Sequence, residues 1–169
     1  MSANENTKEA RETIDRSLLS CAYKYERSIL KNFIRTNMSQ LTTRDIVNDY
    51  FNWRLMNELF VGNRVYERVR QIGFECESLM DISFSRSIGS LNDLRDFHYE
   101  IGRELFDDGV ITWSRILTFI SFSAVLTQEI LQNQPNMDHI RESIVEWTTN
   151  FIDQDLETWM DEQNYWSGF

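Results

Sequence analysis

The most apolar stretch of the chain, residues 107–132, contains an uncharged run from residue 116 to residue 126. Seven of these eleven residues are Ile, Leu, Phe or Val, and they fall on every side of a helical wheel. That pattern is typical of a helix buried all round. Crossing a bilayer takes about 20 apolar residues, and the charges of Arg115 and Glu129 end this run well short of that. The sequence therefore predicts a buried central helix, for which Thr112 offers an N-cap hydroxyl.

The other segments carry apolar residues at every third or fourth position, which indicates helices with one buried face. These stripes predict helices over residues 10–36, 44–60, 64–80, 91–106 and 137–152. Residues 81–90 are rich in serine and predict a loop or a short distorted helix. Strand-like alternation between turn residues does not recur, and the chain contains only one Pro and six Gly. We therefore expect an all-α bundle wrapped around the central helix.

Composition narrows the class of protein further. A chain of 169 residues fits one domain, and its net charge of −10 opposes binding to phosphate backbones, so we expect no nucleic-acid partner. Cys21 and Cys76 lie on apolar helical faces without metal-ligand spacing, which favours reduced core cysteines in a cytoplasmic protein. The polar N-terminus lacks the apolar core of a signal peptide. We expect membrane contact only through a C-terminal anchor that this chain does not include.

The search for catalytic chemistry finds little. The two histidines, His98 and His139, lie on different predicted helices and outside the Glu-x-x-His spacing of di-iron bundles. Phosphate-binding glycine loops and Gly-x-Ser-x-Gly elbows do not occur in the sequence. We therefore expect a protein that is not an enzyme and that uses no cofactor and no metal.

Arg115 is the unusual residue of the central helix. A cation close to a helix N-terminus is disfavoured by the helix dipole, so another interaction should compensate for its position. One interpretation is an internal salt bridge, to Asp108 or Glu104. The other is an arginine that binds the carboxylate of a partner, which its planar guanidinium can hold through two parallel hydrogen bonds.

Four segments of the chain resemble, taken together, the homology motifs of the Bcl-2 family of cell-death regulators. FDDGVITWSRILTFISFSAVL (residues 106–126) resembles the first motif and LETWMDEQNYWSGF (156–169) the second. VYERVRQIGFECE (65–77) resembles the third, called BH3, and RDIVNDYFNWRLMNEL (44–59) the fourth, near the N-terminus. The resemblance covers roughly residues 44–169 and is closest to the Mcl-1-like pro-survival branch. The first two motifs together are specific, whereas the other two alone would be weak.

The resemblance implies a Bcl-2-like helical bundle with a buried central helix and a surface hydrophobic groove. Residues 41–169 would form this single globular domain. Residues 1–40 would be an N-terminal extension with an extra amphipathic helix. Trp113, Gly109, Trp159 and Trp166 would be structural residues of the first two motifs.

The groove of such a domain accepts the amphipathic BH3 helix of a partner. Arg115 would pair with the aspartate of that helix, next to Thr112. The groove itself would be lined by residues carried over from the motif helices: Val69, Ile72, Leu94, Ile101, Leu105, Thr118, Phe119 and Phe122. For each apolar residue among these, a plain core position is an equally good interpretation.

Three residues depart from the family pattern. Thr112 stands where the first motif usually has asparagine, and Ser114 stands where it has glycine. Phe74 stands where the BH3 motif normally has aspartate, so a helix made from this segment would lack the carboxylate that pairs with a groove arginine. We therefore expect this chain to be a poor BH3 ligand itself.

The resemblance thus predicts a pro-survival regulator of apoptosis that sequesters pro-apoptotic proteins, both BH3-only and Bax/Bak-like. The full-length protein would be cytoplasmic, associated with the outer mitochondrial or endoplasmic reticulum membrane. Two alternatives remain: a pro-apoptotic, pore-forming effector of the same fold, and a helical scaffold whose groove is occluded by residues 10–36.

Overall fold

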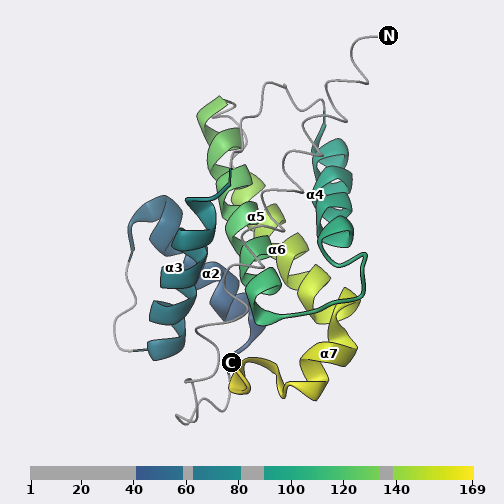
Figure 1. Cartoon of the computed structure of the whole chain (residues 1–169). Helices are drawn as coiled ribbons and strands as arrows, with labels where there is room; N and C mark the ends of the chain where they lie inside the picture. Colours follow the sequence, from purple (N-terminus) through teal and green to yellow (C-terminus); the bar gives the residue numbers. More distant parts are fainter. Residues whose placement is uncertain (1–40, 59–62, 81–89, 134–138) are drawn as a thin grey trace.

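The structure is a computed structural model that describes residues 41–58, 63–80, 90–133 and 139–169 (Figure 1). All regular structure within these ranges is helical, which confirms the all-α prediction. The α-helices are α2 (Thr43–Met56), α3 (Arg64–Glu77), α4 (Leu91–Leu105), α5 (Trp113–Asn133), α6 (Ile140–Asn150) and α7 (Glu157–Glu162). A π-helical segment, η2 (Phe151–Asp155), and a 3₁₀ turn, η3 (Tyr165–Ser167), complete them.

Several predictions fall outside the described residues. These are the helix over residues 10–36, the N-terminal extension 1–40, Cys21, nearly all of the loop 81–90 and the turn around Pro135.

The central helix of the bundle is α5, as the apolar run predicts. It contacts α2, α3, α4 and α6, and in Figure 1 it runs between α2 and α3 on one side and α4 on the other. Fifteen of its 21 residues are buried, and they lie on all sides of the helix, so α5 is enclosed rather than one-faced. Within the described ranges, no helix is both long enough and apolar enough to cross a membrane.

The hydroxyl groups of α5 explain how a helix with several Ser and Thr residues can be enclosed. Thr118, Ser121, Ser123 and Thr127 are fully buried. Each hydroxyl donates to the backbone carbonyl four residues earlier, at distances of 2.7 to 2.9 Å. These bonds satisfy buried donors that would otherwise each destabilise the fold by about 1–3 kcal/mol.

Local signals set where the surrounding helices begin. The side chain of Thr42 accepts a hydrogen bond from the backbone of Asp45, whose carboxylate accepts one from the backbone of Thr42. This reciprocal capping box starts α2. Asn63 caps α3 and Ser90 caps α4 in the same side-chain-to-backbone manner.

The last predicted helix, over residues 137–152, is corrected in two respects. The α-helix begins at Ile140, and from Phe151 it continues as the π-helical segment η2. A π-turn holds one more residue than an α-turn. Phe151 and Ile152 are both buried there.

His98 joins α4 to α5 and α6 inside the core, a role that the sequence did not indicate. Its Nε2 lies 2.9 Å from the Ser123 hydroxyl and 3.2 Å from the Thr148 hydroxyl. Both hydroxyls already donate their single hydrogen to backbone carbonyls, so they accept from Nε2–H. The ring is therefore the neutral Nε2–H tautomer, and its Nδ1 has no hydrogen-bond partner among the described residues.

This environment lowers the pKa of His98 from 6.5 to about 3, because burial disfavours the charged ring. The described groups around it are uncharged: besides the two hydroxyls, it packs against the rings of Phe119, Phe122, Trp147 and Tyr99.

We predict that acid destabilises the fold through His98. Below pH 6.5 the unfolded chain binds a proton that the folded chain excludes until about pH 3, so the free energy of unfolding should fall by up to about 1.4 kcal/mol per pH unit in this window. Urea unfolding of His98→Gln at several pH values should show a shallower pH dependence than the natural chain. His139→Gln, which removes the exposed second histidine, is the control. Equal slopes for the natural chain and His98→Gln would contradict the prediction.

Candidate functional site

Arg115 lies in the first turn of α5 and is almost completely buried, with 2% of its surface exposed. Its Nη2 donates to Oδ2 of Asp108 at 2.7 Å and its Nη1 to Oδ1 of the same carboxylate at 2.5 Å. Nη1 also donates to the backbone carbonyls of Leu105, at 3.1 Å, and Val110, at 2.8 Å. Of the two interpretations of this residue, the structure therefore shows the internal salt bridge, with Asp108 as the acid.

Asp108 belongs to the exposed turn between α4 and α5. Its side chain is 46% exposed, in contrast to the guanidinium that it contacts. The hydrogen bonds from Arg115, followed by the one from the backbone N–H of Val110, lower the pKa of Asp108 from 3.8 to about 2. The next residue, Gly109, has a φ of +72°, a conformation that glycine adopts without strain.

The other predicted clamp residue, Thr112, is half-buried directly before α5. Its hydroxyl accepts from the backbone N–H of Arg115 at 3.3 Å, so it caps the helix as predicted. Ser114, the second departure in this motif, is buried.

The predicted groove residues come together around α5 but lie inside the bundle. Val69 and Ile72 come from α3, Leu94, Ile101 and Leu105 from α4, and Thr118, Phe119 and Phe122 from α5. Their exposed fractions lie between 0 and 3%. In the described chain they therefore occupy core positions, and their role in holding a ligand stays a prediction.

The structural residues of the first two motifs form an aromatic cluster at the N-terminal end of α5. The ring of Trp113 lies 5.0 Å from Trp159, 5.1 Å from Trp166 and 5.2 Å from Phe169, measured between centroids. Trp166 also donates from Nε1 to the Thr43 hydroxyl at 2.9 Å. The two motifs are therefore one packing unit that ties the C-terminal segment to the start of α2 and α5.

Comparison with known proteins shows to which family the chain belongs. The family model described as "Apoptosis regulator proteins, Bcl-2 family" matches residues 69–166, which is more than half of the chain. The chain belongs to the Bcl-2 family. The match includes Arg115 and most of the aromatic cluster, so the resemblance of the first two motifs is confirmed.

Relatives within the Bcl-2 family carry names from more than one branch. The chain is 24% identical over 105 residues to "Apoptosis regulator BAX" of Bos taurus, covering 62% of this chain and 54% of that protein. It is 29% identical over 118 residues to "Bcl-2-like protein 1" of Gallus gallus (68% and 50%) and 28% identical over 110 residues to "Apoptosis regulator Bcl-2" of Gallus gallus (62% and 46%). The chain thus spans about half the length of the curated relatives it matches. These matches do not select the Mcl-1-like branch, which stays a prediction.

The BH3-like segment of this Bcl-2 family chain is α3, and it packs on α5 and α2. The apolar positions of the motif, Val65, Val69, Ile72 and Cys76, are all buried. Phe74, in the position of the usual aspartate, is 56% exposed, and its ring meets the edge of Trp53 on α2. The described α3 therefore shows its apolar face to the core and not to solvent.

Two sets of polar contacts and one close packing contact hold α3 against α2 at three levels, which we call the α2–α3 contact. At the first level, Arg70 binds Asp49 through two hydrogen bonds, one of them 2.9 Å from Nε to Oδ2. Their exposed fractions are only 6% and 3%. Burial raises the pKa of Asp49, although the guanidinium of Arg70 opposes that shift.

The two other levels of the α2–α3 contact involve Tyr50. A Cβ added at Gly73 would lie only 2.4 Å from the Tyr50 ring, so only glycine at this position leaves room for the ring. Farther along α3, Glu77 accepts from the Tyr50 hydroxyl at 2.7 Å and from Arg54 Nε at 2.6 Å.

The buried pair of Asp49 and Arg70 was not predicted from the sequence. A signal was nevertheless present, because each charge falls within the apolar stripe of its helix, beside Tyr50 and Val69 respectively. Charges of opposite sign inside two neighbouring stripes point to a buried pair.

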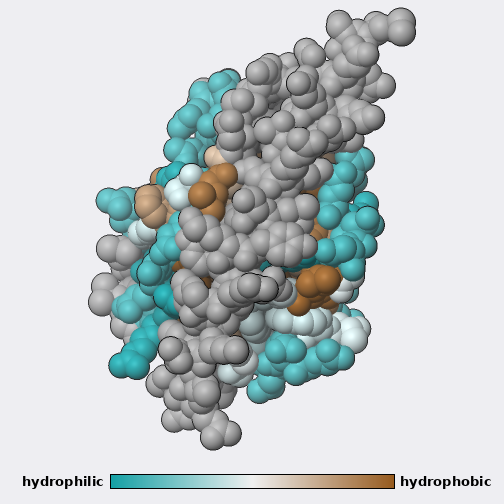
Figure 2. Space-filling model, viewed as in Figure 1, coloured by the Kyte–Doolittle hydropathy of each residue, from teal (hydrophilic) through white to brown (hydrophobic). Residues whose placement is uncertain are grey.

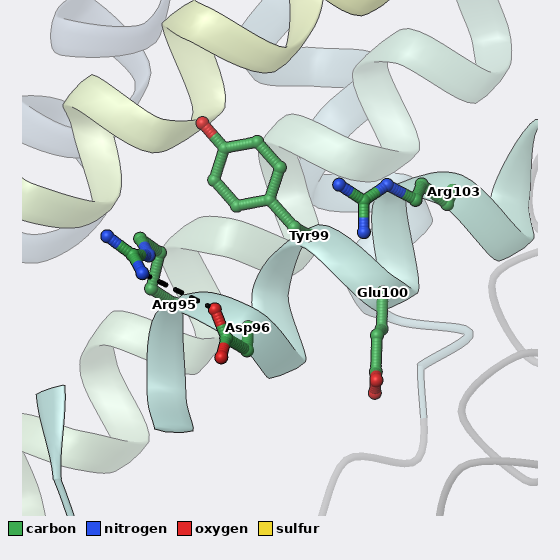
Figure 3. A pocket seen from close by; sticks show the side chains of 5 residues that line it. All are labelled: Arg95, Asp96, Tyr99, Glu100 and Arg103. Atoms are coloured by element: carbon green, nitrogen blue, oxygen red, sulfur yellow. Dashed lines mark ion pairs between the residues drawn. The ribbon is translucent and has the colours of Figure 1, made fainter. Parts of the chain in front are cut away.

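A separate depression of about 440 Å³ lies on the outer side of α4 (Figure 3). It is lined by Arg95, Asp96, Tyr99, Glu100 and Arg103, and none of these is a predicted groove residue. On the face shown in Figure 2, the visible described surface is mostly hydrophilic, with small separate hydrophobic areas. No group of three or more His, Cys, Asp or Glu within the described ranges is arranged to bind a metal.

We predict that the α2–α3 contact depends on the buried Asp49–Arg70 pair. Arg70→Met should leave the Asp49 carboxylate buried without its guanidinium and lower the free energy of unfolding by about 3–5 kcal/mol, whereas the double variant Asp49→Leu/Arg70→Met should recover much of that loss. Urea unfolding measures both. Arg68→Met, which removes the same charge from the more accessible side of α3, is the control. A loss no larger than that of the control would contradict the prediction.

Proposed function

We propose that this chain is a pro-survival member of the Bcl-2 family that binds and sequesters the amphipathic BH3 helix of pro-apoptotic family members. A captured helix is unable to activate or form membrane pores. The proposed partners are BH3-only and Bax/Bak-like proteins, and the mechanism is recognition of a helix in a groove, without catalysis. The site of action that the resemblance implies is the cytoplasmic side of the outer mitochondrial or endoplasmic reticulum membrane.

The observation that carries this proposal is the guanidinium of Arg115. It lies at the N-terminal end of the enclosed helix, next to α4, and it already holds a carboxylate with both Nη atoms. A paired geometry of this kind is what recognition of a ligand aspartate requires. Buried apolar residues from α3, α4 and α5 lie around this enclosed helix, which supplies the chemistry that apolar anchors of a helix need.

The α2–α3 contact favours the pro-survival role over the effector role. An effector of this fold has to expose its BH3 segment in order to dimerise, whereas here α3 is held by the buried Asp49–Arg70 pair and by the bonds of Glu77. Phe74 also replaces the carboxylate that a working BH3 helix carries. Both features argue against α3 acting as a ligand.

Binding as proposed includes an opening step. The predicted groove residues are at most 3% exposed, so the side chains packed around α5 have to move apart before anchors can enter. Each buried anchor contributes about 1.5–3 kcal/mol, and ordering the ligand helix costs about 2–5 kcal/mol. The burial of four anchors therefore contributes more free energy than the ordering of the ligand helix costs, and the difference is available to drive the opening step.

We expect the purified chain to bind BH3 peptides, and we expect Arg115→Ala to weaken that binding by about tenfold or more. The variant removes the guanidinium that meets the ligand aspartate and leaves the Asp108 carboxylate to repel it. Titration of labelled peptides by fluorescence anisotropy measures the affinity.

Arg115→Lys tests the geometry of this contact, because it keeps the charge but loses the planar fork. Arg103→Ala removes an exposed arginine of α4 and controls for net charge, and circular dichroism establishes that each variant is folded. If no peptide of a BH3 panel binds, the proposed function is wrong. If peptides bind with equal affinity to the natural chain and to Arg115→Ala, the arginine has no clamp role.

The effector alternative predicts a different behaviour at membranes. We expect vesicles that contain anionic lipid and a trapped dye to stay intact when the chain is added with an activator BH3 peptide, because α3 stays on the bundle. Dye fluorescence measures release, with detergent as the positive control and peptide alone as the blank. Release of dye that depends on the protein would support the effector instead.

A further inference from the structure

The salt bridge between Arg115 and Asp108 bears on how a ligand carboxylate gains access to the guanidinium. We propose that Asp108 is a built-in competitor for Arg115, so that ligand binding exchanges one carboxylate for another at the same guanidinium. This inference rests on the proposed function and adds to it the residue that determines how strongly the groove selects acidic ligands.

The guanidinium of Arg115 already binds a carboxylate. Both oxygens of Asp108 are engaged by the two Nη atoms of Arg115. A second carboxylate that approached the same edge would meet the first one at hydrogen-bonding range. Two negative charges about 4 Å apart repel strongly wherever the surroundings exclude water. Exchange is therefore favoured over addition.

Arg115 does not depend on Asp108 for its position. The backbone carbonyls of Leu105 and Val110 also accept from Nη1, and the residue is enclosed by the core with only 2% of its surface exposed. Release of Asp108 therefore leaves the guanidinium anchored where it is, ready for another acid.

The side chain of Asp108 is able to move away from Arg115. It lies in the turn between the end of α4 at Leu105 and the start of α5 at Trp113, and residues 107–110 of this turn are all exposed. Its carboxylate has 46% of the side chain exposed, so it becomes hydrated as it rotates away. The buried arginine stays, and the exposed acid moves.

The exchange has a consequence for ligand selection. In the natural chain the ligand aspartate replaces an interaction of the same kind, so it adds little to affinity. A neutral residue at Asp108 removes the competitor, and the ligand aspartate then gains a guanidinium whose charge is otherwise uncompensated.

Four affinities test this. Two BH3 peptides that differ only by Asp or Asn at the acidic position are titrated against the natural chain and against Asp108→Asn. For the natural chain, we expect the Asp peptide to bind at most about threefold more tightly than the Asn peptide. For Asp108→Asn, we expect this preference for the Asp peptide to be about tenfold or greater. Asp107→Asn makes the same change of charge one residue away, in the same exposed turn, and should behave as the natural chain does.

The outcomes separate the inference from the function on which it rests. If both peptides bind and the preference for Asp is no larger in Asp108→Asn than in the natural chain, Asp108 orients Arg115 and the competitor role is wrong. If neither peptide binds any of the proteins, both the proposed function and this inference are wrong.

A second measurement uses the natural chain and does not depend on the folding of a variant. The carboxyl carbon of Asp108 reports its pKa by nuclear magnetic resonance, and in the free chain Arg115 holds that pKa at about 2. Saturation with the Asp peptide should raise it toward its ordinary value of 3.8, because the acid is released to solvent. Saturation with the Asn peptide should not. A pKa that stays low in the complex with the Asp peptide overturns the inference.

Discussion

A helix that is enclosed on every side has to satisfy its polar groups from within the protein, and α5 imposes this condition on the whole bundle. Its Ser and Thr hydroxyls are bonded to its own backbone, so the neighbouring helices supply mainly apolar contact along most of its length, with His98 of α4 bonded to Ser123. Arg115 is the one charged residue that is buried in α5. A guanidinium is stable in a protein interior only when hydrogen-bond acceptors surround it. The end of α4 and the turn after it provide one carboxylate and two carbonyls. The end of α5 that carries the charge is thus where the sequence of the adjoining turn matters most.

The same condition explains why α3 is fixed while a ligand helix would be exchangeable. The apolar face of α3 covers α5, and its polar edge is joined to α2 by a buried ion pair and by the bonds of Glu77. A visiting helix would replace only side-chain contacts at α4 and α5 and one exposed acid. A bundle built in this way retains its own segment of the BH3 type and, under the proposed function, would accept a foreign one.

The sequence predicted the fold well because the signals that specify it are local. Apolar periodicity predicted α2 to α6 within a few residues of their observed bounds, and the capping residues Thr42 and Ser90 lie near the starts of two of these helices. The π-helical segment was not predicted, because Phe151 packs there against Tyr99 of α4 and Phe119 of α5, contacts that a local period does not reveal.

The site was predicted only in part, since its chemistry depends on pairs that are distant in sequence. The motif resemblance indicated Arg115 and the tryptophans, and Asp108 was one of two candidate acids. Residue spacing alone does not decide between an internal and an external acid for an arginine. Asp49, Arg70 and His98 were not recognised, because a charged or polar side chain within an apolar stripe reveals its partner only when two helices are placed side by side.

The bond from Trp166 to Thr43 has a kinetic consequence. It joins residues 123 positions apart, and closing so long a loop is costly until the intervening helices have come together, so we expect this bond to form late in folding. Interactions that are absent from the transition state govern how fast a protein unfolds and hardly affect how fast it folds. We therefore expect the aromatic cluster at the N-terminal end of α5 to act on the lifetime of the native state, so that a weakened Trp166 shortens that lifetime without slowing assembly.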